Sequence, residues 1–170
     1  MTATETITIS LDDFRSNLLA VLDEAFIGGT EVNVFLDTGT SLFETLATID
    51  AATASKGFSE RASNIAAQVN HVRFYLDTLM EGLTNGWGPA DWAGSWQIGE
   101  VTEDEWQDLV ARLRASWETT RAFAATNEQW DANFVGGAFG IVAHTAYHLG
   151  EIRLSLAALH VPEPADAPEA

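Results

Sequence analysis

The sequence predicts an all-α protein built as an antiparallel bundle of four long helices. Apolar residues recur at spacings of three and four along almost the whole chain, which is the period of an α-helix. Strong N-capping signals precede two of the helical stretches, and 46% hydrophobic with 19% charged residues is typical of a globular domain. We therefore expect one domain over residues 1–161 and a flexible, acidic, proline-containing tail over residues 162–170.

The first helix is expected to begin at Ser10, a good N-cap residue that is followed closely by acidic side chains. It ends at the Gly28-Gly29 pair. A long first connection follows. Residues 30–41 are the least helical part of the chain and form either a short extended segment or a loop over the bundle. A short helix over about residues 41–54 is expected after it.

The second long helix is expected to use Ser59 as its N-cap and to run to about Leu83, because residues 85–89 (NGWGP) break the helical pattern. Residues 87–99 are rich in Trp and Gly and should form an ordered loop before the third helix.

A capping box, formed by Thr102 and Glu105, begins the third helix, which ends near Asn127. The fourth helix is expected over about residues 133–160 and is the most apolar of the four. It contains two of the four histidines.

Composition limits the classes of partner. A net charge of −17 would repel nucleic acids and anionic membranes, so we expect neither as a partner. The most apolar stretch, residues 134–150, is short for a membrane span. The N-terminal sequence MTATETITIS has no secretory-signal pattern, so a cytoplasmic location is expected. The chain lacks cysteine, so any metal would be bound through nitrogen and oxygen.

His144 and His148 are the main candidate ligands. Four residues apart on a helix, their side chains are offset by about 40° and leave the same face one turn apart. Two imidazoles in this arrangement can bind one ion. The alternative is a pair of structural histidines, but burying such a pair is costly unless both rings have partners.

His71 and His160 are less informative. His71 lies beside the apolar stripe of the second helix, in a more polar row that includes Gln68. Periodicity alone favours a boundary histidine that is hydrogen-bonded to water or to Gln68. His160 lies near the end of the last helix, where its charge suits the helix dipole, and we interpret it as structural.

Several segments resemble the DinB-like superfamily. Residues 65–76 (IAAQVNHVRFYL) are similar to its second helix, and residues 143–153 (AHTAYHLGEIR) are similar to its last helix. Residues 91–96 (DWAGSW) and 101–106 (VTEDEW) resemble its middle part. The likeness covers about residues 10–160 and is weakest over the first connection.

The resemblance implies a four-helix bundle of DinB-like type with an open divalent metal site. In that family one ligand comes from the second helix and two from the H-x-x-x-H of the fourth, which correspond here to His71, His144 and His148. Relatives with assigned activities depend on small thiols, such as mycothiol-dependent maleylpyruvate isomerase and bacillithiol transferase, and several are homodimers. The resemblance thus implies a homodimer that acts on a small-molecule substrate.

Three neutral imidazoles would leave a coordination position for water or substrate, as in catalytic metal sites. An ion there could lower the pKa of a bound water or thiol. Because the chain has no cysteine, the thiol would be a low-molecular-weight cosubstrate. Zinc or nickel is favoured, and iron, manganese and copper are alternatives.

The leading hypothesis is a metal-dependent thiol S-transferase, with a hydrolase as a related possibility. The alternatives are a non-catalytic metal-binding protein and a dimeric helical bundle of the stress response. A ferritin-like di-iron oxidase would need Glu-x-x-His pairs on two helices, and the sequence has none.

Two residues near the histidine pair are candidates for catalysis. Glu151 is about 60° around the helix from His148 and could act as a base or hydrogen-bond the ring; the alternative is a surface charge. Tyr147 is a candidate for the pocket wall. The other candidates for that wall are Tyr75, Asn64 and Gln68.

The remaining candidates concern the mouth of the site. Trp87, Trp92 and Trp96 either form an apolar lid or pack their loop onto the bundle. Arg73 is about 200° around its helix from His71, and Arg153 is about 140° from His148. Neither arginine should face the metal, so a dianionic substrate is less favoured than a more neutral compound.

Overall fold

The computed structural model describes residues 8–29, 33–59 and 61–160. These residues form six α-helices and one 3-10 helix, without a strand among them, which confirms the all-α prediction. Four helices are long: α1 (Leu11–Ile27), α4 (Ile65–Asn85), α5 (Glu103–Thr126) and α6 (Ala132–Leu159). The tail predicted over residues 162–170 lies outside the described residues.

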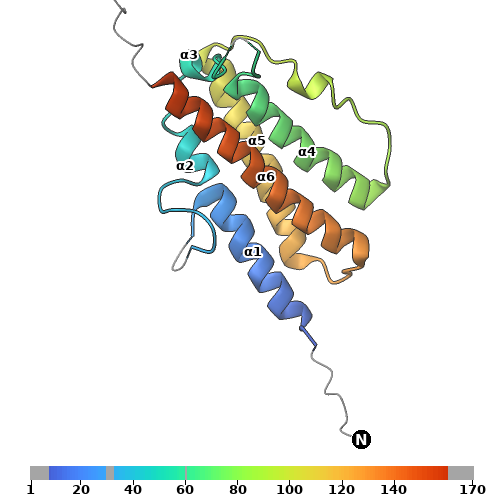
Figure 1. Ribbon diagram of the computed structural model, residues 1–170. Coiled ribbons are helices and arrows are strands. Elements are labelled where there is room, and N and C mark those ends of the chain that lie inside the picture. The colour runs from blue at the N-terminus through green and yellow to red at the C-terminus, as the bar shows by residue number, and fades with distance from the viewer. Residues whose placement is uncertain (1–7, 30–32, 60, 161–170) are drawn as a thin grey trace, which may run out of the picture.

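The four long helices pack side by side (Figure 1). Helix α4 contacts both α5 and α6, and α1 contacts the same two helices, so a shared core lies between them. Apolar side chains from all four helices fill this core. Within the described residues no helix is both long and apolar enough to cross a membrane.

Helix α1 begins as predicted, because the Ser10 side chain accepts a hydrogen bond from the Asp13 amide. It ends at Gly28, whose φ of 93° lies in the region that favours glycine. The capping box of Thr102 and Glu105 at the start of α5 is also confirmed. Helix α6 is capped by Asp131, two residues before the predicted start.

The predicted start of α4 is wrong by several residues. Its N-cap is Asn64, whose side chain accepts from the Ala67 amide, and Ser59 lies in the preceding loop. The loop folds back tightly before the helix begins, since the Ile65 amide donates to the Lys56 carbonyl at 3.2 Å. Capping preference alone could not distinguish Ser59 from Asn64, because both residue types are good N-caps.

The first connection holds two short helices instead of one. Helices α2 (Leu42–Leu46) and α3 (Ala51–Ala54) are separated because Asp50 caps the second, accepting from the Thr53 amide. The described part of residues 30–41 is a loop of bends and turns and not an extended strand.

This loop is held by Glu24, a buried carboxylate that sequence analysis did not identify. Glu24 is only 1% exposed and accepts hydrogen bonds of 2.7, 2.7 and 2.6 Å from the amides of Val34, Phe35 and Leu36. Burial alone raises the pKa of Glu24, but the three amide donors outweigh it and hold the pKa below its usual value. The Glu24 carboxylate therefore supplies the hydrogen-bond acceptors that a helix or strand would have supplied to these three backbone amides.

The Trp- and Gly-rich loop between α4 and α5 is ordered, as predicted, and contains the 3-10 helix η1 (Gly94–Trp96). Helix η1 lies against α4 (Figure 1). Asp91 supports the turn before η1 by accepting from the Gly94 amide at 2.8 Å. The packing of η1 on α4 brings the loop to the part of α4 that faces α6.

Candidate metal centre

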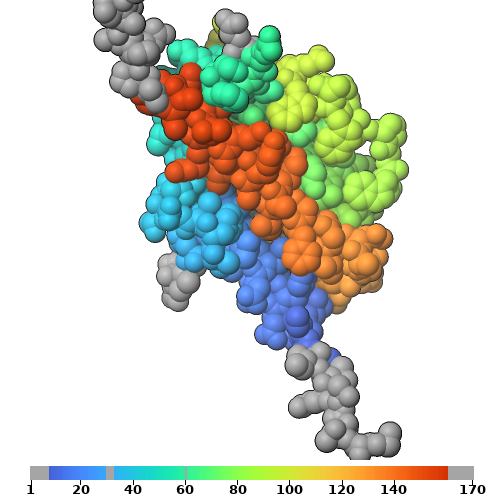
Figure 2. All heavy atoms as spheres, viewed as in Figure 1, coloured from blue at the N-terminus to red at the C-terminus, as the bar shows by residue number. Residues whose placement is uncertain are grey.

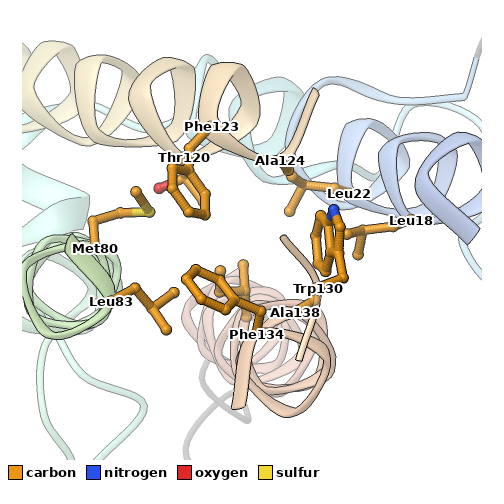
Figure 3. Close-up of a pocket in the computed structure, with 11 residues that line it drawn as sticks. Leu18, Leu22, Met80, Leu83, Thr120, Phe123, Ala124, Trp130, Phe134 and Ala138 are labelled. Atoms are coloured by element: carbon orange, nitrogen blue, oxygen red, sulfur yellow. The ribbon is translucent and has the colours of Figure 1, made fainter. Parts of the chain in front are cut away.

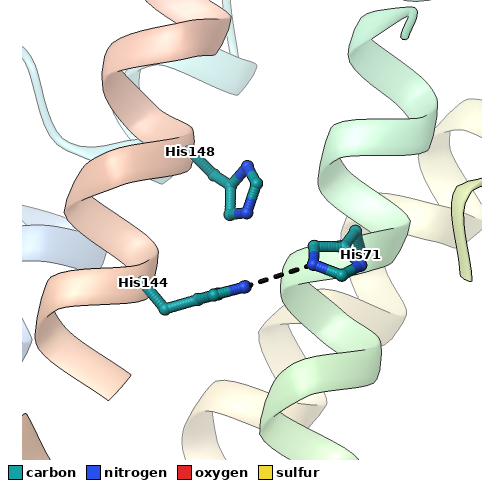
Figure 4. Close-up of side chains that lie close together, drawn as sticks. All are labelled: His71, His144 and His148. Carbon is teal, nitrogen blue, oxygen red and sulfur yellow. Dashed lines mark hydrogen bonds between the residues drawn. The ribbon is translucent and has the colours of Figure 1, made fainter. Parts of the chain in front are cut away.

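Three histidines converge between α4 and α6. His71 extends from α4 toward His144 and His148, which extend from α6 one helical turn apart (Figure 4). One ring nitrogen from each histidine lies within 4.8 Å of the others. The Nε2 atoms of His71 and His144 are 3.3 Å apart. Two nitrogens bound tetrahedrally at zinc distances would be about 3.3 Å apart, so the spacing of this pair suits a shared ion.

The three rings are held in their neutral form. His71 and His148 are 8% and 3% exposed, and His144 is partly buried. Burial, followed by the repulsion from neighbouring histidines, lowers the pKa of His71 to about 4 and that of His144 to about 3. Burial also lowers the pKa of His148, although Glu151 acts in the opposite direction. Near neutral pH, each ring therefore has one nitrogen with a free electron pair.

Ser95 determines which nitrogen of His71 is free. The Ser95 hydroxyl donates to the Trp92 carbonyl at 2.6 Å, so it can only accept from the His71 Nδ1, which lies 2.7 Å away. The proton of His71 is consequently on Nδ1, and its Nε2 electron pair points toward the other two histidines. Ser95 is 3% exposed, which protects this hydrogen bond from water.

His148 is oriented in the same way by two acceptors. Its Nδ1 lies 2.6 Å from the side-chain amide oxygen (Oε1) of Gln68 and 3.0 Å from a Glu151 carboxylate oxygen. Because both partners accept, the His148 proton is on Nδ1, and Nε2 is free. Partners of this kind fix the tautomer and orientation of histidine ligands in metal sites. Gln68 thus pairs with His148, and His71 pairs with Ser95, whereas periodicity alone suggested water or Gln68 as the partner of His71.

His144 is supported by packing on one side and by His71 on the other, because its Nε2 faces the His71 Nε2 at 3.3 Å. Its ring stacks on Tyr75 with centroids 3.8 Å apart and an interplanar angle of 10°. Its Nδ1 is buried without a hydrogen-bond partner among the described residues. Of the three rings, His144 is thus the one whose polar contact is with another histidine of the cluster.

The three tryptophans in the loop have different roles. Trp96 stacks on His71 with centroids 3.9 Å apart, and Trp92 meets His71 edge-on at 6.2 Å. Trp87 lies over Gly82, away from the histidines, where a Cβ on that glycine would come within 2.4 Å of the indole. Two of the three candidate lid residues therefore cover the histidine cluster, and the third packs the loop onto α4.

The structure also locates the candidates for the pocket wall and for catalysis. Tyr147 is 62% exposed, and interaction with Glu151, by a side-chain hydrogen bond and by charge, raises its pKa. Asn64 is not free to line a pocket, since it caps α4 and donates to the carbonyls of Ile98 and Gly99.

A cavity of about 430 Å³ lies directly beside His148. Among the three histidines only His148 reaches its wall. The wall is formed by Phe58, Ser59, Arg61, Ala62, Ser63, Gln68, Trp96, Tyr147, His148 and Glu151. The cavity thus brings the loop before α4 together with the side of α6 that carries Tyr147 and Glu151, and Figure 2 shows the two segments adjoining on one face.

The arginines agree only in part with the sequence analysis. Arg73 pairs with Asp77 at 2.6 Å, and Arg153 reaches Thr45 at 3.5 Å, so both point away from the histidines as predicted. Arg61 nevertheless lines the cavity. The sequence analysis considered only the arginines on the two histidine-bearing helices, and Arg61 lies on neither of them.

Sequence reasoning missed Ser95 and Arg61 as residues of the site. Both lie in loops, where no periodicity indicates which way a side chain points. His160, in contrast, behaves as predicted: it is the C-cap residue of α6, and its Nδ1 lies 2.6 Å from the Leu156 carbonyl.

Comparison with known proteins adds no relative. No family model, no curated protein and no solved structure matches this chain. The resemblance to the DinB-like superfamily accordingly stays a prediction.

Proposed function

We propose that this protein is a divalent-metal-dependent enzyme that transfers a small thiol to an electrophilic small molecule. We further propose that its four-helix bundle is of the DinB-like type and that it acts as a homodimer. The observation that carries the metal site is the convergence of His71, His144 and His148. Hydrogen bonds to Ser95 on one side and to Gln68 and Glu151 on the other leave the Nε2 atoms of His71 and His148 free.

A cation is the simplest partner for this cluster. The Nε2 atoms of His71 and His148 carry free electron pairs, and protonation is disfavoured because burial lowers the pKa of all three rings. A divalent ion satisfies all three at once. Imidazole nitrogens suit zinc and nickel, with iron, manganese and copper as alternatives.

His71, His144 and His148 would hold the ion, which when bound supplies a Lewis acid that favours the thiolate form of a thiol. In this proposal Glu151 accepts the thiol proton. Its position in the cavity wall, 3.0 Å from His148 Nδ1, supports that role. Tyr147 lines the same cavity and donates a hydrogen bond to the substrate.

The proposal is tested by metal analysis of freshly purified protein, followed by reconstitution with zinc, nickel, manganese or iron(II). Each form is assayed with a panel of small thiols and electrophiles. We expect stoichiometric metal and turnover that requires both the metal and a thiol. Turnover with water alone would indicate a hydrolase instead.

Stoichiometric metal without turnover for any thiol would support the alternative of a non-catalytic metal-binding protein. Absence of metal uptake by the folded protein would contradict the proposed site and leave the dimeric helical bundle as the remaining interpretation.

A further inference from the structure

Arg61 differs from the other arginines in its surroundings. The chain has 8 basic residues against 25 acidic ones, so an arginine has many possible partners. Four of the other six arginines form ion pairs with aspartates: Arg15, Arg73, Arg112 and Arg121. Arg114 lies over the Phe43 ring, and Arg153 reaches Thr45. Among the described residues Arg61 forms no such pair, and it lines the cavity beside His148.

The cavity has the size and the wall of a small-molecule site. Its volume of about 430 Å³ lies within the range of roughly 300–1,000 Å³ that is usual for ligand pockets. Phe58 and Trp96 supply apolar surface, whereas Ser59, Ser63 and Tyr147 supply hydroxyl groups. Such a wall can hold an apolar body and a polar end group.

The cavity wall carries one basic and one acidic side chain, Arg61 and Glu151. The Glu151 carboxylate is engaged with His148 at 3.0 Å and forms no ion pair with Arg61. An anionic ligand would therefore be attracted by Arg61 and repelled by Glu151. A second negative group close to Glu151 would be unfavourable.

We propose that Arg61 binds the carboxylate of a small monocarboxylate whose other end reaches the histidine cluster. This inference rests on the proposed function, since it names a substrate class for the same site. The carboxylate belongs either to the thiol or to the electrophile. A guanidinium suits this role because it can donate two parallel hydrogen bonds to a carboxylate.

The test uses cobalt(II)-loaded protein, whose visible absorption reports both the bound ion and a thiolate that joins it. The probes are ω-mercaptocarboxylates of increasing chain length, the matching ω-mercaptoamides, and thiol-free carboxylates of the same lengths. Dissociation constants are measured for wild type, Arg61→Gln and Arg61→Lys. Arg112→Gln is the matched control, since it removes the same charge from an exposed ion pair elsewhere.

If the carboxylate is on the thiol, Arg61→Gln should weaken the mercaptocarboxylates that span the cavity by about 10-fold. The mercaptoamides should be unaffected, Arg61→Lys should restore part of the affinity, and Arg112→Gln should change nothing. An Arg61 effect confined to thiol-free carboxylates would support the same subsite and assign the carboxylate to the electrophile.

Equal losses for amides and carboxylates, or no effect of Arg61→Gln at any chain length, would overturn the inference. Failure of cobalt to bind would contradict the proposed function instead. In that case calorimetric titration of the thiol-free carboxylates into metal-free protein still decides the subsite, because binding must depend on Arg61 if the inference is right.

Discussion

The two ends of the α4–α6 pair differ in character: one end is packed with apolar side chains, and the other carries the histidine cluster. Toward the C-terminal end of α4, side chains from α1, α4, α5 and α6 surround an apolar cavity of only about 20 Å³ (Figure 3). Leu22, Leu83, Phe134 and Ala138 belong to its wall. Nearer the other end, His148 lines a cavity of about 430 Å³ whose wall is partly polar.

One end of the bundle is thus filled by apolar packing, whereas the other end holds the candidate site. The apolar cavity has room for about one water molecule but little to hydrogen-bond it, so its side chains serve the core. The histidine end instead buries polar atoms, which is costly unless each has a partner. We expect substitutions at the apolar end to affect stability and substitutions at the histidine end to affect metal binding.

The largest expected effect is the loss of metal on His148→Ala. Removing one of three ligands should abolish stoichiometric binding, a loss of about 100-fold or more in affinity, while the helical content survives. Metal analysis and circular dichroism measure the two properties. His160→Ala is the control, because that histidine lies at the end of α6 and should leave the metal in place. Stoichiometric metal in His148→Ala would defeat the proposed centre.

Leu22→Ala should have the reverse effect, lowering stability while metal binding is retained. Leu22 is 1% exposed and lines the apolar cavity, so truncation should lower the free energy of unfolding by about 2–5 kcal/mol. Urea denaturation measures this loss. The metal affinity of the folded fraction should equal that of wild type; a change in it would show that the two ends are coupled.

Ser95→Ala tests the hydrogen bond that orients His71. Without an acceptor for the Nδ1 proton, the ring loses its fixed tautomer, and metal affinity should fall about 10- to 100-fold. Competition with a chelator measures the affinity. Ser116→Ala removes an exposed hydroxyl that bonds to Asp77, and serves as the control. Unchanged affinity in Ser95→Ala would mean that stacking on Trp96 alone orients the ring.

The fourth prediction concerns the pH dependence of the metal-free protein. The pKa values of His71 and His144 are lowered to about 4 and about 3, whereas an unfolded histidine titrates near 6.5. As the pH falls from about 6.5 to 4, the unfolded chain takes up protons that the folded protein does not. Stability should therefore decrease over this range, by up to about 2 kcal/mol per histidine at pH 5.

Urea denaturation in the presence of a chelator, at pH 7.5 and pH 5, measures this dependence. His144→Gln should reduce it, whereas Leu22→Ala should lower stability by the same amount at both values. Glu24 contributes in a different range, because its pKa is lowered below 4.5 and its stabilisation is lost only as the pH falls further. A metal-free protein equally stable at both values would contradict the buried, neutral state of the histidines.

Local sequence signals predicted much of the fold. Ser10 with Asp13, and Thr102 with Glu105, cap their helices as expected, since capping involves residues only three apart. The start of α4 was misplaced because the tight return of the loop onto Lys56 depends on backbone contacts that residue preferences do not encode. The split between α2 and α3 could not be predicted, because the segment contains no glycine or proline to interrupt the helical pattern.

The candidate site was predicted less evenly. The spacing of His144 and His148 indicated a shared face, and the structure brings the two rings together with centroids 4.4 Å apart. His71 required the resemblance to a family, because its own periodicity favoured a boundary position. Ser95 and Arg61 could not be predicted, since a loop residue reaches a site only through the path that its loop takes.

The sequence by itself determined the helical fold, the caps of α1 and α5, and the pairing of His144 with His148, because all of these depend on residues a few positions apart. Only the tertiary structure decided that His71 joins that pair and that Ser95 and Gln68 leave the Nε2 atoms of His71 and His148 free. It also decided that Arg61 lines the cavity beside His148. These contacts join residues that are distant in the chain, and their geometry follows from how α4, α6 and two loops pack together.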